Sequence, residues 1–501
     1  MTEELKELKR RLGVVSDLHN AEAVLSWDQQ TYMPPKGAVP RSMQMATLGR
    51  LAHEHFISDD IGKLLDQVGS ENGAHGYDSD EASLLRVTRR DYDKARRVPS
   101  AFVEELTRTA SIGLEAWTQA RMESNFKLFQ PHLEKIVELE IQLANYLGYQ
   151  DRIYDALLDE YEPGMTTRQV EQIFQPLKGE LTALVNTLQK KSDAVNDAVL
   201  HDEYDEQQQW DFGIAVIKQI GFDFQSGRQD KSAHPFTTGF GIGDTRITTR
   251  VDKHFLPMML FGTIHETGHA LYDMGYRPEL DRTPLAGGAS LGVHESQSRL
   301  WENVVGRSRG FWKYWFPRLR EVFPSQLADQ DAESFYRAIN KVAPSFIRVE
   351  ADEVTYSLHI MLRFEIENML VERKVKVVDV PELWNAKMKE YLGIVPPDDA
   401  QGCLQDIHWS YGSIGYFATY SLGSMFAVQL FEQAQREIPT LLQQIENGEY
   451  AELLGWLRKN LHAHGRKFTL DELAKRITGE SLQSRSYVAY LKKKFGEIYG
   501  I

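Results

Sequence analysis

The chain has 501 residues, with 72 acidic side chains against 57 basic ones and a formal net charge of −15. Hydrophobic residues make up 42% and charged residues 26%, which excludes a disordered or collagen-like chain and leaves a globular protein with a sizeable core. The acidic balance argues against nucleic-acid binding, because the basic clusters Arg89-Arg90 and Lys492-Lys493-Lys494 sit among acids and are predicted to be solvated helix faces.

The cysteine content and the hydropathy of the chain indicate its cellular compartment. The one cysteine, Cys403, allows no intrachain disulfide, which fits a reducing compartment. The N-terminus is charged from Glu3 onward and has no apolar run typical of a signal peptide. The longest apolar stretch, 255–264, is about half as long as a membrane crossing requires. We therefore expect a cytoplasmic protein with no membrane partner.

Helical periodicity dominates the sequence. Apolar residues at steps of three and four predict helices near 3–26, 41–66, 79–97, 101–126, 131–147, 166–184, 206–220, 349–372, 422–434 and 483–498. Pro131 is expected at a first helical position, and Gly148 directly after a last one. Thr166 and Gln169 have the spacing of a capping box.

Strand signal is confined to one window, 233–251. It is rich in Gly, Thr and aromatic residues and has a turn at Gly243-Asp244, so it predicts a short β-hairpin or small sheet. The stretch 395–420 is rich in Gly, Tyr and Trp and is expected to be irregular. Because no repeat or linker divides the chain, we expect one mainly helical domain over 1–501, in two lobes around a groove.

The segment from His265 to His269 contains the pattern His-Glu-x-x-His. On a helix, positions i and i+4 share a face, so the two imidazoles can bind one cation with Glu266 beside its open side. Histidines at this spacing can also be hydrogen-bonded core residues. The glutamate between them and the apolar sequence before them favour a metal site on a buried helix.

A metal site of this kind requires a third protein ligand. Gly275 stands six residues after His269, where the metzincin pattern would place a histidine, so a carboxylate on a second helix is favoured. Ser290 is a candidate N-cap, and the helix that follows it contains Glu295 and Glu302 on one face. Spacing does not choose between these two glutamates, and either could be a solvated carboxylate.

Six motifs follow one another along the chain: His234-Pro235-Phe236, Asp244-Thr245-Arg246-Ile247-Thr248, His265-Glu266-Thr267-Gly268-His269, His294-Glu295-Ser296-Gln297, Ile347-Arg348-Val349-Glu350-Ala351-Asp352 and Gly402-Cys403-Leu404-Gln405-Asp406-Ile407-His408-Trp409. With these motifs in this order, and with the earlier segment from Trp27 to Arg41, the sequence resembles the carboxypeptidase Taq family of metallocarboxypeptidases over nearly the whole chain. The resemblance implies a neurolysin-like helical fold with a deep active-site groove, a homodimer, and removal of single C-terminal amino acids from peptides with broad side-chain tolerance.

The resemblance also selects the metal ligands. It implies Glu295 as the third ligand, so that His265, His269 and Glu295 hold one divalent ion. Zinc is the expected ion, with cobalt or manganese also compatible with two nitrogens and one carboxylate. Glu266 is expected to be the general base for the attacking water. Asp273, four residues after His269, could support a ligand from behind or could be a surface charge.

Related helical peptidases use a histidine and a tyrosine late in the chain to stabilise the oxyanion. His408 and Tyr420 are therefore the expected donors, and Tyr411 and Tyr416 are competitors. Each of these aromatic side chains could instead serve only in packing.

An exopeptidase that acts at the C-terminus must recognise a free carboxylate. Arg348 is the leading candidate, because it lies in the Ile-Arg-x-x-Ala-Asp motif, and Arg246 is second. The alternative for Arg348 is a structural ion pair, for instance with Asp352. By resemblance, His234-Pro235-Phe236 and the residues 244–248 are expected to shape the substrate channel.

Two other functions remain compatible with the sequence. An oligopeptidase or dipeptidyl carboxypeptidase could use the same fold and metal site. A non-catalytic scaffold that binds peptides and retains a metal is a third possibility, but the complete His-Glu-x-x-His argues against it, since binding alone does not require Glu266. The substrate is expected to be a peptide with a free C-terminus.

Overall fold

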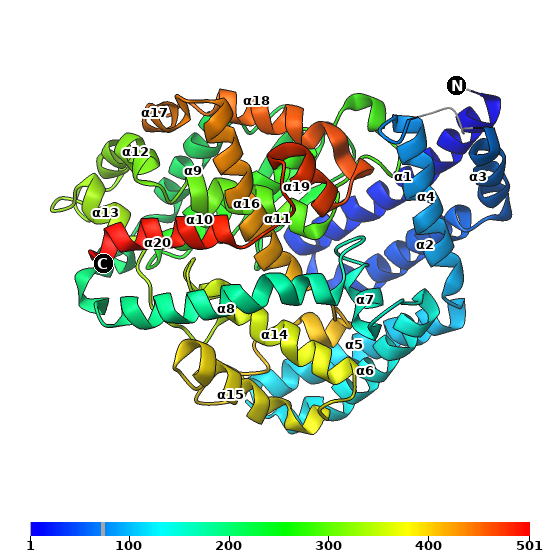
Figure 1. Ribbon diagram of the computed structural model, residues 1–501, viewed down its shortest axis with the longest axis horizontal. Helices are drawn as coiled ribbons and strands as arrows, with labels where there is room; N and C mark the ends of the chain where they lie inside the picture. Colours follow the sequence, from blue (N-terminus) through cyan, green and yellow to red (C-terminus); the bar gives the residue numbers. More distant parts are fainter. Residues whose placement is uncertain (1, 72–75) are drawn as a thin grey trace.

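The computed structural model describes residues 2–71 and 76–501 and is mainly helical, as predicted (Figure 1). None of the described helices is long and apolar enough to cross a membrane. The helices are α1 (Glu3–Thr31), α2 (Ala38–Phe56), α3 (Asp59–Glu71), α4 (Asp80–Arg97), α5 (Ser100–Met122), α6 (Phe126–Leu147), α7 (Ile153–Leu158), α8 (Thr167–Gln189), α9 (Glu206–Ile220), α10 (Leu256–Asp273), α11 (Leu291–Arg299), α12 (Arg309–Val322), α13 (Ala332–Ala338), α14 (Tyr356–Val371), α15 (Val380–Leu392), α16 (Ala418–Glu437), α17 (Leu441–Glu446), α18 (Ala451–Asn460), α19 (Leu470–Thr478) and α20 (Arg485–Tyr499).

Local signals predicted several helix ends correctly. Thr166 and Gln169 form the expected capping box at the start of α8, each side chain accepting a hydrogen bond from the other residue's backbone N–H. Gly148 follows α6 with φ of 80°, a value that favours glycine.

Several helix boundaries differ from the prediction; for example, α14 begins at Tyr356 rather than near 349, and two other differences have a clear local cause. Pro131 lies inside α6, because the helix begins earlier, at Phe126, where the Asn125 side chain accepts a hydrogen bond from the backbone of Lys127 (3.2 Å). The helix predicted over 41–66 is two helices, α2 and α3, with a break after Phe56. Apolar periodicity continues across this break, so the sequence pattern did not reveal it.

A three-stranded sheet contains the predicted hairpin. The strand order is β1-β3-β2, with β2 (Thr237–Gly239) antiparallel to β3 (Thr245–Thr249) and β1 (Gly227–Lys231) parallel to it. The strand β1 lies before the predicted window. Its sequence Gly-Arg-Gln-Asp-Lys has no alternation of apolar and polar residues, so the pattern does not predict a strand there. The sheet packs against α10, the helix that contains His-Glu-x-x-His.

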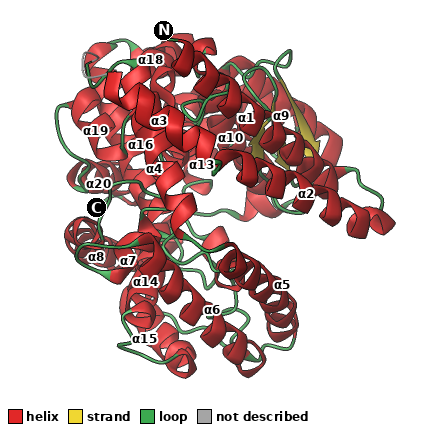
Figure 2. Cartoon of the chain, turned by 90° about the vertical axis from the view of Figure 1, so that its right-hand side faces the viewer, coloured by secondary structure: helices red, strands yellow, loops and turns green. Residues whose placement is uncertain are grey.

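In the described residues, buried apolar side chains form one large core and two smaller ones, of which the smallest consists of Ile217, Phe222, Ile247 and Ala270. The large core runs from Trp117 to Tyr499, and the second core joins α1, α3 and α4 to Leu280 and Leu285. Figure 2 shows α5, α6, α14 and α15 grouped below α1, α3, α9 and α10. The single domain over 1–501 stays a prediction.

The prediction that Lys492-Lys493-Lys494 forms a solvated helix face is wrong for Lys494. Lys494 of α20 is buried rather than solvated, and its ammonium group lies 2.7 Å from the carboxylate of Glu353. The same ammonium donates to the backbone oxygen of Asn303 (3.4 Å) in η5 (Leu300–Val305), a π-helical turn. Packing of α20 against this turn takes the side chain out of water, and the carboxylate of Glu353 supplies the opposite charge.

Candidate metal centre and catalytic site

The site is built where α10 and α11 meet. Helix α11 begins at Ser290, the predicted N-cap, whose hydroxyl accepts a hydrogen bond from the backbone of Val293 (3.1 Å). Gly268 of α10 faces α11 so closely that a Cβ there would lie 2.5 Å from the Cα of Ser298. Only glycine allows this approach, which brings side chains from the two helices within reach of one another.

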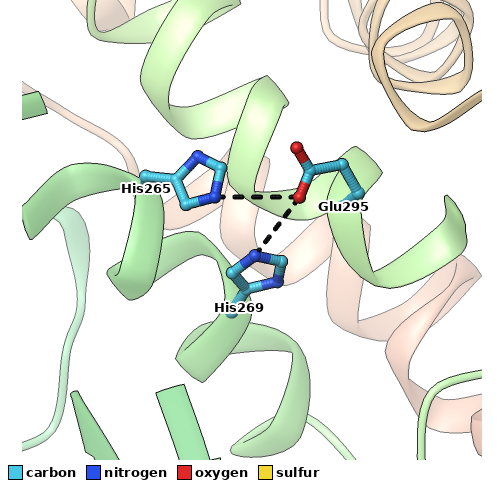
Figure 3. Close-up of side chains that lie close together, drawn as sticks. All are labelled: His265, His269 and Glu295. Carbon is cyan, nitrogen blue, oxygen red and sulfur yellow. Dashed lines mark ion pairs between the residues drawn. The ribbon is translucent and has the colours of Figure 1, made fainter. Parts of the chain in front are cut away.

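Three side chains converge at this helix contact (Figure 3). The Glu295 Oε2 atom lies 3.7 Å from His265 Nε2 and 3.4 Å from His269 Nε2, and the three ligand atoms all lie within 4.8 Å of one another. Tetrahedral zinc with bonds of about 2.0–2.2 Å spaces its ligand atoms by about 3.3–3.6 Å. The two imidazole nitrogens and the carboxylate oxygen are therefore spaced so that they can bind one divalent ion.

Glu302, the other candidate ligand, lies on the opposite side of His265. Its Oε2 atom is 2.8 Å from His265 Nδ1, whereas Glu295 faces Nε2. Arg299 and Arg307 contact the same carboxylate at 3.2 and 3.3 Å. Burial opposes ionisation of Glu302, but Arg299, His265 and Arg307 outweigh it and lower its pKa to about 2. Glu302 thus orients the His265 ring from behind.

Arg299 keeps Glu295 ionised and was not identified from the sequence. Its Nε donates to Glu295 Oε1 (2.7 Å), which leaves Oε2 turned toward the two histidines. Burial alone would raise the pKa of Glu295, but Arg299, His265 and His269 lower it well below its usual range. The spacing of Glu295 and Arg299, four residues apart on one helix, was the available sequence signal.

A chain of hydrogen bonds supports His269. Its Nδ1 lies 2.6 Å from Nδ1 of His294, and His294 Nε2 lies 3.0 Å from Asp273 Oδ1. The hydroxyl of Tyr276 donates to the same Asp273 oxygen (2.7 Å). When Nε2 of His269 is used as a ligand, its Nδ1–H donates to His294, and the Nε2–H of His294 donates to Asp273. Asp273 therefore acts through His294.

Glu266 is buried next to the sheet. The hydroxyl of Thr237 in β2 donates to Glu266 Oε2 (2.7 Å) and also lies 2.9 Å from the backbone oxygen of Glu266. The strand β2 thus fixes one carboxylate oxygen of the expected base.

The late aromatic candidates lie together, with one exception. Tyr420 in α16 has its hydroxyl 3.4 Å from His408 Nε2, and the ring of Tyr416 packs against both. Burial raises the pKa of Tyr416 and Tyr420, and the negative charge of Glu295 adds to this shift. Helix α16 packs closely on α11, since a Cβ at Gly423 would lie 2.7 Å from Cβ of Glu295. Tyr411 is 49% exposed, so it is the weakest of the four candidates.

Arg348 forms an ion pair, but with Asp406 rather than Asp352. Its Nε and Nη2 donate to Asp406 Oδ1 (3.0 and 2.8 Å), and its Nη1 donates to the hydroxyl of Tyr356 (3.1 Å). Arg363 donates to the other oxygen of Asp406 (2.6 Å). Two buried guanidinium groups therefore share one carboxylate, which leaves an excess of one positive charge.

This charge acts on the neighbouring histidine. Burial, together with the positive charges of Arg348 and Arg363, lowers the pKa of His408 to about 4, although Asp406 opposes the shift. The imidazole of His408 is therefore neutral at neutral pH and has one N–H to donate.

The remaining candidates lie on and beside the sheet. Arg246 in β3 is paired with Asp244 (3.0 Å) and stacks over the rings of Trp27 and Phe240, with its guanidinium carbon 4.3 and 4.8 Å from the ring centres. These contacts hold α1 on the sheet. His234 is exposed in the loop between β1 and β2. Roles for Arg246 and His234 in substrate binding stay predictions.

A mainly helical protein with His-Glu-x-x-His on one helix and a converging glutamate on the next belongs to the class of helical metallopeptidases. The model of the family "Carboxypeptidase Taq (M32) metallopeptidase" matches residues 7–495. The chain therefore belongs to this family, as the motifs predicted, and it is a metallocarboxypeptidase whose activity depends on a divalent metal.

Sequence and structure comparisons agree with this assignment. The chain is 40% identical to thermostable carboxypeptidase 1 of Thermus thermophilus, over 99% of this chain and 98% of the relative, and 37% identical to carboxypeptidase 1 of Bacillus subtilis with the same coverage. Among solved structures, it is similar to an M32 carboxypeptidase from Deinococcus radiodurans, with a TM-score of 0.97, 39% identity and full coverage of both chains. A Pyrococcus furiosus carboxypeptidase gives a TM-score of 0.96 at 36% identity, with 99% of each chain covered.

Proposed function

We propose that the protein removes single amino acids from the free C-terminus of peptides, with broad tolerance of the side chain removed. The convergence of His265 Nε2, His269 Nε2 and Glu295 Oε2 beside the buried Glu266 carries this proposal. Zinc is the proposed ion, because two imidazoles and one carboxylate with an open fourth position are its usual catalytic ligands, although cobalt and manganese accept similar sets.

Glu266 is the proposed general base. When bound, the ion acts as a Lewis acid that polarises the scissile carbonyl and lowers the pKa of the attacking water. Glu266 accepts the proton of that water on its carboxylate and later gives it to the leaving amine. The Thr237 hydroxyl holds Oε2 of Glu266, and Oε1, for which the described residues supply no hydrogen bond, is the oxygen proposed to accept the proton.

Tyr420 and His408 are the proposed donors to the carbonyl oxygen as it becomes negative. The two groups lie 3.4 Å apart, and the neutral state of His408 gives it a single N–H for this purpose. Donors that are fixed in place before the reaction stabilise developing charge most effectively.

Arg348 is the proposed docking group for the substrate carboxylate. A guanidinium has five N–H groups, and Arg348 uses three of them, two on Asp406 and one on Tyr356. The two that remain, one on each terminal nitrogen, can pair with a carboxylate. The positive charge left over between Arg348, Arg363 and Asp406 favours an anion at this place.

A peptide ladder tests the reaction. Incubating a peptide with the metal-loaded enzyme and following the products by mass spectrometry should show the loss of one C-terminal residue per step, and none with a chelator. Loss of residue pairs, or internal cuts, would instead show a dipeptidyl carboxypeptidase or an oligopeptidase. Metal analysis of the purified protein identifies the ion.

Replacing the base separates catalysis from metal binding. Glu266→Gln keeps the size of the side chain but cannot accept a proton, so turnover should fall by about 10²–10⁴-fold. Metal content, measured by elemental analysis, should stay equal to that of the unmodified enzyme. Unchanged turnover would contradict the role of Glu266.

Three further proposals concern the whole chain. One domain over 1–501 is supported by the large core that joins residues from Trp117 to Tyr499. A cytoplasmic location is supported by the single cysteine, Cys403, which is buried and has no intrachain partner in the sequence. The homodimer is proposed from the family resemblance, and sedimentation of the purified protein tests it.

A further inference from the structure

One buried carboxylate holds the loop between His408 and Tyr416 at two points. Glu367 of α14 accepts a hydrogen bond from the Trp409 indole on Oε1 (2.8 Å) and from the backbone of Gly415 on Oε2 (3.0 Å). The hydroxyl of Tyr154 donates to the same Oε2 (2.7 Å). Glu367 is fully buried, so each of these bonds forms away from water.

The backbone of the loop has no room to shift at its second contact. Gly415 has φ of 99°, and a Cβ there would lie 2.7 Å from the backbone of Leu157 at the end of α7. At the first contact, the ring of Trp409 packs edge-on against Trp384, with ring centres 5.9 Å apart. Packing therefore brings both donors to the Glu367 carboxylate in one arrangement.

A carboxylate matches these donors, whereas an amide does not. An ionised carboxylate accepts on both oxygens, while a glutamine turns an NH₂ group toward at least one N–H or O–H. Burial raises the pKa of Glu367 to about 7, although the three hydrogen bonds act against this shift, so the ionised form that accepts all three bonds predominates above that pH. A buried donor left without an acceptor destabilises the local structure.

His408 depends on this loop for its position. Its Nδ1 is buried and has no hydrogen-bond partner among the described residues, although Asp406 Oδ1 lies 3.9 Å from it. Its Nε2 has one long contact, with the Tyr420 hydroxyl (3.4 Å). The rings of Tyr416 and Phe417 pack around it, with centres 5.1 and 4.5 Å away. The imidazole is therefore oriented by the backbone on either side rather than by bonds of its own.

We propose that Glu367 is a positioning residue for the hydrolysis: by holding Trp409 and Gly415, it fixes the loop that presents His408. The inference rests on the proposed role of His408 as a donor to the reacting carbonyl oxygen. Glu367 itself lies beneath the loop and acts through it.

Two glutamates on the same helix give a matched test. Glu367→Gln should lower kcat by about 10- to 100-fold, because a small displacement of a catalytic group has an effect of this size. KM and metal content should change little, because neither Arg348 nor the metal ligands contact Glu367. Glu365→Gln is the control, since Glu365 faces Lys178 (3.0 Å) and Tyr391 instead, and it should leave kcat and KM within about twofold.

A double-mutant cycle shows whether the effect passes through His408. His408→Ala should lower kcat, and adding Glu367→Gln to it should lower kcat no further, because the loop then has no donor to position. If the double variant loses kcat by the product of the two single losses, the inference is overturned while the role of His408 stands. The same holds if the Glu367→Gln enzyme is as active as the Glu365→Gln control. A fully active His408→Ala enzyme would overturn both.

A second variant covers the case in which Glu367→Gln does not fold. Trp409→Phe keeps an aromatic ring against Trp384 but removes one of the donors to Glu367. It should lower kcat in the same direction, with KM and metal content again little changed. An unchanged kcat in this variant would overturn the inference.

Discussion

Both ring nitrogens of His265 face a carboxylate, and the carboxylate at Nδ1 is expected to strengthen metal binding at Nε2. Its Nε2 faces Glu295, and its Nδ1 is bound by Glu302 at 2.8 Å. Carboxylates in this position orient a ligand imidazole and increase its basicity. Glu302→Ala should therefore weaken metal binding by about 10- to 100-fold, measured by competition with a chelator. Glu333→Ala on α13, an exposed partner of Arg309, should leave affinity unchanged, and equal affinities in the two variants would refute the role of Glu302.

Arg348 has two N–H groups that no described residue uses, and the charge around it is positive. A peptide with an amidated C-terminus offers no anion to this group. Amidated peptides should therefore be cleaved much more slowly than free ones, and Arg348→Ala should remove most of that difference, read from the ratio of kcat/KM values. Arg246→Ala tests the second candidate: if it abolishes the difference and Arg348→Ala does not, the docking residue is Arg246.

At the scale of elements, the short helix α11 depends on how its first turn is held. Ser290 caps it, and the backbone N–H of Gly292 donates to the buried carboxyl of Glu162. Burial raises the pKa of Glu162 to about 8, although Ser290 and Gly292 act against it. The folded pKa thus lies above the value of about 4.3 in an unfolded chain, and the stability contributed by the protonated group is lost as pH rises toward 8.

Glu162→Gln should remove this pH dependence, because glutamine keeps an oxygen for the N–H of Gly292 but does not ionise. Between pH 6 and pH 8, the free energy of unfolding of the unmodified protein should fall relative to that of the variant, on the order of 1 kcal/mol per pH unit. Urea unfolding of both proteins at several pH values measures this difference. Parallel stability curves would show that Glu162 does not titrate in this way.

The elements that sequence predicted best are those whose signals are local. The apolar run of α10, the N-cap Ser290 and the capping box at Thr166 depend on neighbours within a few residues, and all three are in place. The strand β1 was missed because its residues pair with β3 across a segment that contains β2, and they have no apolar pattern of their own. Pro131 was misplaced because Asn125 begins the helix earlier.

At the scale of the whole molecule, the motifs predicted where chemistry would lie but not which residues would hold it in place. Arg348 contacts Asp406, 58 positions later in the sequence, and Tyr356, eight positions later. Glu367 accepts a hydrogen bond from the hydroxyl of Tyr154, which lies 213 positions earlier in the sequence. Such contacts exist only after the chain has packed, and no spacing in the sequence encodes them.

The metal centre is electrostatically balanced by the protein itself, and this predicts how the metal-free chain behaves. Glu295 is paired with Arg299, and Glu302 with Arg299 and Arg307. The helices α10 and α11 also touch backbone to backbone at Gly268 within the large core. Removing the ion therefore leaves Glu295 and Glu302 paired with arginines, and should not unfold the protein.

Chelation should leave the helical circular dichroism signal unchanged at 25 °C while abolishing activity. Because an ion binds the folded state only, saturating zinc should raise the melting temperature, with a stabilisation of about 4 kcal/mol at a thousand times its Kd. Adding zinc back should restore both activity and melting temperature. Loss of the helical signal on chelation would mean that the ion, rather than the Gly268 contact and the surrounding core, holds α10 and α11 together.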